Sequence, residues 1–221
     1  MEKFRLLQRQ ADARNDLPDS IRELYSRYIG NRYTAKKGML LEQLEIMIPF
    51  LFECVSRSQL ILLVTAHYEM NQLIFTEASK FPIEHVEALI DELNAQWLSS
   101  LSVNEKSIVE QLPASDLEIE AFRICRSLAM VEDVQLERGS FYLGANNLAQ
   151  RLGETKYIAA MILEAFCELD ILKVVKKGDS FQKERPLEKG RRRKATIYRW
   201  LPRLPEPSEK PGTRGADRNQ T

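Results

Sequence analysis

The chain has few residues of the kinds that usually bind metals or cross-link a fold. Its 221 residues include three cysteines and two histidines. Cys54, Cys125 and Cys167 are far apart, each within an apolar helical pattern, and three cysteines cannot all pair with one another. They are expected to be small buried residues in a reducing compartment. Neither His67 nor His85 has cysteine or carboxylate neighbours at metal-ligand spacing, so no metal site is expected.

Catalytic motifs and membrane segments are also missing from the sequence. No glycine-rich phosphate loop, nucleophile elbow or HExxH motif occurs. No N-terminal apolar run has the length of a signal peptide, and no uncharged stretch reaches the roughly 18 residues that a membrane helix needs. We therefore expect a cytoplasmic protein that is not an enzyme, that uses no cofactor and that does not enter a membrane.

Positive and negative charges balance overall but are unevenly distributed. The chain has 32 basic and 32 acidic residues. Residues 1–137 contain 14 Lys and Arg against 22 Asp and Glu, a net charge of −8, whereas residues 138–221 contain 18 against 10, a net charge of +8. This asymmetry favours a basic C-terminal module that binds nucleic acid, joined to an acidic scaffold that is not itself attracted to phosphate.

The first half of the chain has the hydrophobic periodicity of a helical bundle. Residues 1–16 form a polar segment, and helices are predicted from Leu17 to Gly30, from about Ala35 to Val55, from about Ser58 to Ala78, from Pro82 to about Leu101, and over 102–112. Pro49 is expected to kink or divide the second of these helices. Because the helices are amphipathic and their connections are short, we predict an antiparallel helical bundle over residues 17–112.

The second half predicts a winged helix-turn-helix over residues 115–201, which makes the whole chain mainly α. A helix from Leu117 to about Val131 is expected to follow a linker near Pro113. A short helix from 147 to 152, a turn at Gly153, a longer helix and two strands at 171–176 and 196–201 complete the module. Residues 202–221 are rich in proline, glycine and charge, and are expected to be a disordered tail.

The longer helix of this module is the predicted recognition helix. Thr155 is its expected N-cap. One face is predicted to be buried and carries Ile158, Ile162, Phe166 and Leu169; the other would meet the major groove and carries Lys156, Tyr157, Ala160, Met161 and Glu164. Asp170 follows at a position where a positive φ is usual, and Trp200 is expected to anchor the second strand.

The loop between the two strands, here called the wing, is strongly basic. Residues 173–203 contain 12 basic and three acidic residues, a local net charge of +9. The predicted DNA contacts are Thr155, Lys156, Tyr157, Lys176, Lys177, Lys183, Arg185, Lys189, Arg191, Arg192, Arg193 and Lys194. Only Lys156 on the recognition helix is a cation, and Glu154 and Glu164 lie nearby. The sequence therefore predicts affinity chiefly from phosphate contacts of the wing, with modest base discrimination.

A family resemblance rests on two segments of the chain, KKGMLLEQLEIMIPFLFECVSRSQLILLVTAHYEMNQLIF and EAFRICRSLA. The chain resembles, over roughly residues 30 to 200, the helical C-terminal region of bacterial primase-like replication proteins of mobile elements. In that family a helical segment and a winged helix follow the primase and polymerase portion. The acidic metal-binding motifs of the primase portion have no counterpart here, so the resemblance implies an accessory DNA-binding end and no polymerase.

Two other functions remain open from the sequence. A transcriptional regulator could use the same module, with the bundle as a dimerisation or effector domain. From a different class, a protein-interaction adaptor could dock a larger replication enzyme, or a second copy of the chain, through the acidic bundle. A palindromic DNA site bound by a dimer would favour the regulator, and binding by a monomer without sequence preference would favour the replication role.

Overall fold

A computed structural model describes residues 17–30, 32–33, 35–36, 38–72, 74–75, 80–112, 116–131, 133, 135–177 and 195–202. Within these residues it has eight helices and one three-stranded antiparallel sheet. The prediction of a mainly helical fold is therefore confirmed. The segments 1–16 and 203–221, predicted to be a polar segment and a disordered tail, lie outside the described residues, and so do Pro113, Ala114 and Ser115 of the predicted linker.

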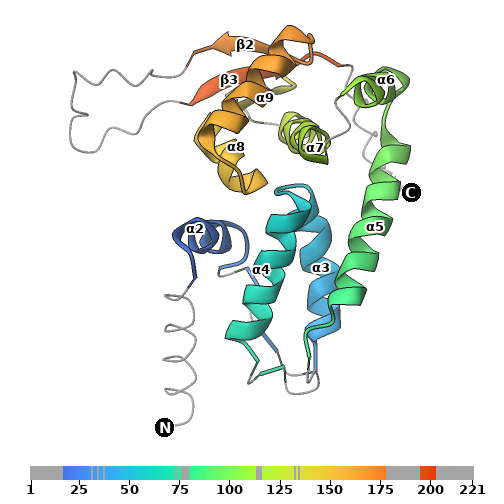
Figure 1. Ribbon diagram of the computed structural model, residues 1–221, viewed down its shortest axis with the longest axis vertical. Helices are drawn as coiled ribbons and strands as arrows, with labels where there is room; N and C mark the ends of the chain where they lie inside the picture. Colours follow the sequence, from blue (N-terminus) through green and yellow to red (C-terminus); the bar gives the residue numbers. More distant parts are fainter. Residues whose placement is uncertain are drawn as a thin grey trace, which may run out of the picture.

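Three helices of the first half alternate in direction along the chain, so that the second is antiparallel to the other two, as Figure 1 shows. They are α3 (Leu40–Phe52), α4 (Arg57–Met70) and α5 (Ile83–Ser100), and α3 packs against both of the others. α3 continues through Pro49 and is not divided there. The fourth predicted member, α2 (Asp19–Tyr28), lies beside α4 but crosses its direction, and it also contacts α8.

The helix predicted over 58–78 is wrong at its C-terminal end, because α4 stops at Met70. Asn71 follows as the C-cap, and its side-chain amide donates to the carbonyl oxygen of His67 at 2.8 Å. A side chain that hydrogen-bonds a terminal carbonyl in this way replaces the bond that a further helical turn would make. The apolar residues after Asn71 therefore do not extend the helix, although their spacing matched one.

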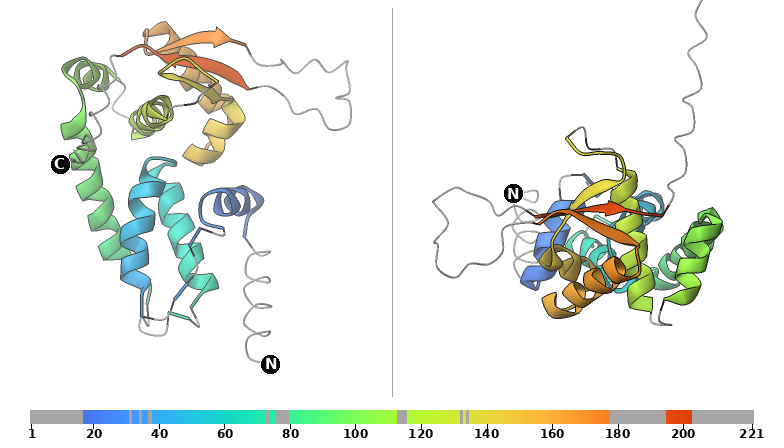
Figure 2. Two further views of the ribbon diagram at one scale, coloured as in Figure 1. Left: turned by 180° about the vertical axis from the view of Figure 1, so that it is seen from behind. Right: turned by 90° about the horizontal axis from the view of Figure 1, so that it is seen from above.

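Two further helices follow the bundle. α6 (Val103–Gln111) begins with a capping box, in which the Ser102 hydroxyl accepts from the backbone N–H of Glu105 and the Glu105 carboxylate accepts from that of Ser102. α7 (Asp116–Met130) follows and lies between the bundle and the sheet, as the left view of Figure 2 shows. The Glu105 side chain is fully buried and accepts a hydrogen bond from Nε of Arg126 on α7 at 2.7 Å. This bond connects α6 to α7.

The C-terminal half consists of α7, β1 (Ser140–Leu143), α8 (Ala145–Leu152), α9 (Lys156–Glu168), β2 (Leu172–Lys176) and β3 (Thr196–Trp200). The strand order is β1-β3-β2, so β3 is central. The pairing of β2 with β3 was predicted, whereas β1 was not. β1 has only four residues and its partner is distant in the chain, since Phe141 pairs with Tyr198.

Buried apolar side chains form one continuous cluster that includes residues of both halves. Aromatic rings mark its centre: the rings of Phe122 and Trp200 lie 4.8 Å apart, and Phe122 also meets Phe166 and Trp97 edge-on. Trp200 is 4% exposed, so its predicted anchoring of the last strand is confirmed. None of the described helices has the length and apolar character that a bilayer-spanning segment requires.

Candidate nucleic-acid interface

α8, the first helix of the predicted helix-turn-helix, is fixed to the junction between α3 and α4. Arg151 donates from Nη1 to the carbonyl oxygen of Cys54 at 2.9 Å and from Nε to Oδ1 of Asn147 at 2.7 Å. Ser56 completes the junction, since its N–H donates to the Arg151 carbonyl at 2.8 Å and its hydroxyl to the Leu152 carbonyl at 3.1 Å. Two carbonyl groups at the C-terminal end of α8 are thereby hydrogen-bonded by Ser56 of the bundle.

The turn between α8 and α9 has the geometry that the sequence predicted. Gly153 has φ of 78° and caps α8, and a Cβ at this position would lie 2.2 Å from Nε2 of Gln59. Thr155 caps α9, and its hydroxyl accepts from the N–H of Ile158 at 3.3 Å. The positive φ favours glycine, and a larger residue here would also force the Gln59 side chain of α4 to move, so the turn and the docking of α8 both depend on Gly153.

α9 has one buried and one exposed face, as predicted. Its exposed face carries Lys156, Tyr157, Ala160, Met161 and Glu164, and its core face includes Ile162 and Phe166. Tyr157 is 72% and Met161 52% exposed. Leu169 was predicted to be buried and is 52% exposed, because α9 ends at Glu168 and the chain turns at Asp170, whose φ is 53°.

Beside α9, the sheet presents basic residues on its outer face. In β2 Leu172 is buried, whereas Lys173 to Lys176 and the following Lys177 are exposed. Lys173 lies directly opposite Arg199 of β3. Like charges in opposed positions repel each other, and an ion pair between Arg199 and Glu137 offsets part of that repulsion.

The structure describes five of the twelve predicted DNA contacts. Thr155, Lys156 and Tyr157 lie together at the start of α9, and Lys176 and Lys177 lie at the end of β2. The other seven, Lys183, Arg185, Lys189, Arg191, Arg192, Arg193 and Lys194, belong to the wing and lie outside the described residues. Residues 145–177 and 195–202 contain six basic and four acidic residues, a net charge of +2, whereas the wing residues 178–194 contain seven and three, a net charge of +4.

Sequence reasoning missed two buried arginines on α7. Arg123 is 3% exposed, and burial lowers its pKa to about 10. Its guanidinium lies 3.8 Å from the centre of the Phe52 ring and donates a hydrogen bond to the Val55 carbonyl at 3.2 Å. Arg126 is 6% exposed. Buried arginines need a paired carboxylate, so Glu120, three residues before Arg123, could have indicated the burial of Arg123. In the structure the Glu120 carboxylate lies 4.0 Å from Nη2 of Arg123.

The cysteine interpretation was partly wrong. Cys125 is buried as expected, and burial raises its pKa to about 12. Cys54 and Cys167 are only half-buried. Arg151 donates to the Cys54 carbonyl, yet the pKa of the Cys54 thiol is raised, because desolvation outweighs the charge of Arg151.

Within the described part of the chain, no three His, Cys, Asp or Glu side chains are placed to hold a metal ion. Comparison of the chain with protein-family models, with curated proteins and with solved structures finds no match.

Proposed function

We propose that residues 116–202 form a winged helix-turn-helix that binds duplex DNA, with the start of α9 in the major groove and the wing along the phosphate backbone. The order α7, β1, α8, α9, β2, β3 supports the assignment. One observation carries it: α8 is held by the bundle through Arg151 and Ser56, while the opposite face of α9 is exposed. A rigidly mounted helix with a free outer face suits groove insertion.

The charges near α9 support binding through phosphates more than through bases. Lys156 is the one cation on the exposed face of α9, and Glu154 and Glu164 flank it. Arginine, lysine, asparagine and glutamine are the side chains that usually read base edges. If six wing cations neutralise phosphates, the slope of log affinity against log salt is about −5.

The role in replication or maintenance of a mobile element rests on the resemblance of residues 30–200 to the primase-associated region. A transcriptional regulator would use the same surface. Sequence preference and stoichiometry separate the two, because a regulator protects a defined site as a dimer. We favour the replication role, since the exposed face of α9 has little base-reading chemistry.

The test is fluorescence anisotropy with labelled duplex and single-stranded DNA over a salt series. The variant replaces Arg191, Arg192 and Arg193 with alanine. We expect submicromolar duplex binding by the parent chain, and in the variant a slope shallower by about 3 together with a large loss of affinity at low salt. Full affinity in the variant would refute the role of the wing, and no binding by the parent chain at low salt would refute DNA binding.

A matched control removes the same amount of charge from the body of the molecule. Lys36, Lys80 and Lys106 are exposed and lie in the first half of the chain. Their replacement with alanine changes the net charge by the same three units. We expect at most a twofold change in DNA affinity, since screening at physiological salt limits charge effects to about 8 Å.

A protein-interaction adaptor is the second candidate, favoured by one observation. Two large apolar side chains on α9, Tyr157 and Met161, are both more than half exposed, so this adaptor would dock a partner through α9 and not through the acidic bundle that the sequence favoured. Replacing both with serine would then abolish partner capture while leaving the salt slope of DNA binding unchanged. Loss of DNA binding in the same variant would instead place these side chains in the groove.

A further inference from the structure

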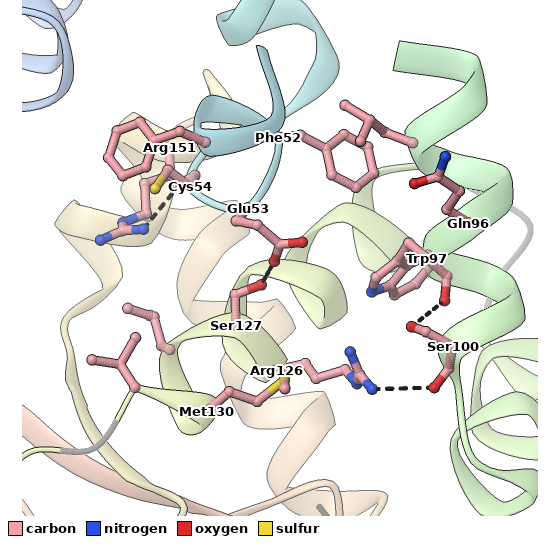
Figure 3. A pocket seen from close by; sticks show the side chains of 14 residues that line it. Phe52, Glu53, Cys54, Gln96, Trp97, Ser100, Arg126, Ser127, Met130 and Arg151 are labelled. Carbon is pink, nitrogen blue, oxygen red and sulfur yellow. Dashed lines mark hydrogen bonds between the residues drawn. The ribbon is translucent and has the colours of Figure 1, made fainter. Parts of the chain in front are cut away.

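A pocket of about 600 Å³ opens between the bundle and the C-terminal half. Figure 3 shows its walls, which come from α3 and the loop after it, from α5, from α7, and from Arg151 of α8. Clefts for small organic molecules usually have about 300–1,000 Å³. The pocket is therefore large enough for a ligand of one to three rings.

The lining of the pocket is mainly apolar and includes three aromatic rings, those of Phe50, Phe52 and Trp97. At its mouth Met130 is 48% and Val131 65% exposed. Single exposed apolar side chains are common on protein surfaces, but a group of them around an apolar cleft marks an interaction site. Aromatic walls favour a flat, aromatic occupant, because offset and edge-to-face ring contacts add to the area that is buried.

The charged side chains of the pocket compensate one another. Arg126 is neutralised by the buried carboxylate of Glu105 at 2.7 Å. Glu53 and Arg151 bring one negative and one positive charge to the lining, and each is hydrogen-bonded to uncharged groups: Glu53 to the Ser127 hydroxyl, and Arg151 to oxygens of Cys54 and Asn147. An ion entering such a pocket would lose its hydration without gaining a free counter-charge. The lining therefore favours a neutral molecule.

We propose that this pocket is a binding site for a neutral, largely aromatic small molecule. The site is distinct from the DNA surface, and the inference does not rest on DNA binding. Because the lining residues come from α3, α5, α7 and α8, an occupant contacts the bundle and the C-terminal half together. Binding to the folded state alone raises the melting temperature of the whole chain.

The probe for the test is N-phenyl-1-naphthylamine, a neutral fluorophore that brightens in apolar surroundings, compared with its sulfonated analogue 8-anilinonaphthalene-1-sulfonate. We expect saturable binding of one neutral molecule per chain, and at least fivefold weaker binding of the anion. Equal affinity for the two compounds would overturn the assignment of a neutral ligand. Absence of saturable binding of the neutral probe would overturn the site.

A variant that fills the pocket locates the binding. Gln96 lies on α5 at the pocket and is exposed, and its amide donates to Glu92 on the same helix, so Gln96→Trp adds a ring without disturbing the core. We expect at least tenfold weaker probe binding. Ala95→Trp is the matched control, because Ala95 is exposed and is not part of the lining. Equal probe affinity in the Gln96→Trp variant and the control would overturn the proposal.

A second measurement uses the unmodified chain. Cys54 lines the pocket and is half-buried, whereas Cys167 is half-buried away from it. Alkylation by N-ethylmaleimide, followed at each cysteine by peptide mass spectrometry, should slow at least threefold at Cys54 when the neutral probe is saturating. The rate at Cys167 should stay the same. Equal rates at Cys54 with and without the probe would contradict occupancy of this pocket.

Discussion

Breaking the buried ion pair between Glu105 and Arg126 is expected to destabilise the fold strongly. The Glu105 side chain is 0% exposed and that of Arg126 8%, and the bond from Nε to Oε1 is 2.7 Å long. The other carboxylate oxygen of Glu105 accepts the N–H of Ser102 at 2.9 Å. Glu105 therefore stabilises the start of α6 and neutralises a cation on α7 at the same time.

The magnitude follows from what each substitution leaves behind. Arg126→Met leaves a carboxylate in an apolar environment without its counter-charge, which costs about 3–5 kcal/mol of unfolding free energy. Glu105→Gln keeps an acceptor for the N–H of Ser102 but leaves the guanidinium unpaired, so a loss of similar size is expected. The double variant removes both charges and should lose about 2–3 kcal/mol less than the sum of the single losses.

Urea unfolding followed by far-ultraviolet circular dichroism at pH 7 measures all three variants. A domain of this kind has about 5–15 kcal/mol of stability, so either single substitution should shift the midpoint visibly. The control is Arg27→Met, which breaks the exposed pair with Glu23 at the same 2.7 Å distance and should cost no more than about 1 kcal/mol. A loss at Arg126 no larger than at Arg27, or additive losses in the double variant, would refute the reasoning.

Two further predictions concern buried or constrained positions. His67 is buried, and desolvation lowers its pKa to about 4, whereas a histidine in the unfolded chain titrates near 6.5. The stability that neutral His67 contributes is fully present above about pH 6.5 and decreases as the pH falls towards 4. Between pH 7 and pH 5 the free energy of unfolding should fall by about 2 kcal/mol. His67→Gln should reduce that loss when urea unfolding is compared at the two pH values. Gly153→Ala should cost about 1–2 kcal/mol in the same assay, because φ is 78° and the Gln59 side chain must move.

Each of these predictions has a control at an equivalent position. His85→Gln removes the other histidine of the chain and leaves the hydrogen bond between the Tyr25 hydroxyl and Nδ1 of His67, at 2.9 Å, intact. A parallel change of pH dependence in both histidine variants would contradict the assignment to His67. Gly144→Ala lies at the other end of α8, where φ is −118° and no atom stands within 4 Å of the added methyl group. If its cost equals that at Gly153, the left-handed turn is not the cause.

Local features of the C-terminal half were predictable because they depend on near neighbours in the chain. The turn at Gly153, the N-cap at Thr155, the outward face of α9 around Tyr157, and the positive φ of Asp170 each follow from residue type and helical spacing. The wing was also identifiable from the sequence, because its basic residues lie close together in the chain. The sequence thus indicated the candidate DNA surface, and the structure describes its α9 part.

Features that depend on distant partners were missed. β1 is four residues long and is stabilised by β3, more than fifty positions later. Burial of Arg126 depends on Glu105, 21 positions earlier, and the end of α4 depends on the Asn71 cap and not on apolar spacing. The pocket could not be read from the chain, because its walls come from four separate helices.

The sequence by itself determined which segments are helical, which faces are apolar and where the positive charge lies, since periodicity, capping and charge are properties of short stretches of chain. Only the tertiary structure decided how those segments meet. In that structure α2 lies across the bundle, Arg151 of α8 donates to the Cys54 carbonyl, and a pocket opens between the bundle and the C-terminal half. Such contacts join residues that are far apart in the chain, by 42 positions in the bond of Tyr25 to His67 and by 97 in that of Arg151 to Cys54. Their energies depend on complementary shape and on the pairing of buried polar groups, which no local pattern encodes.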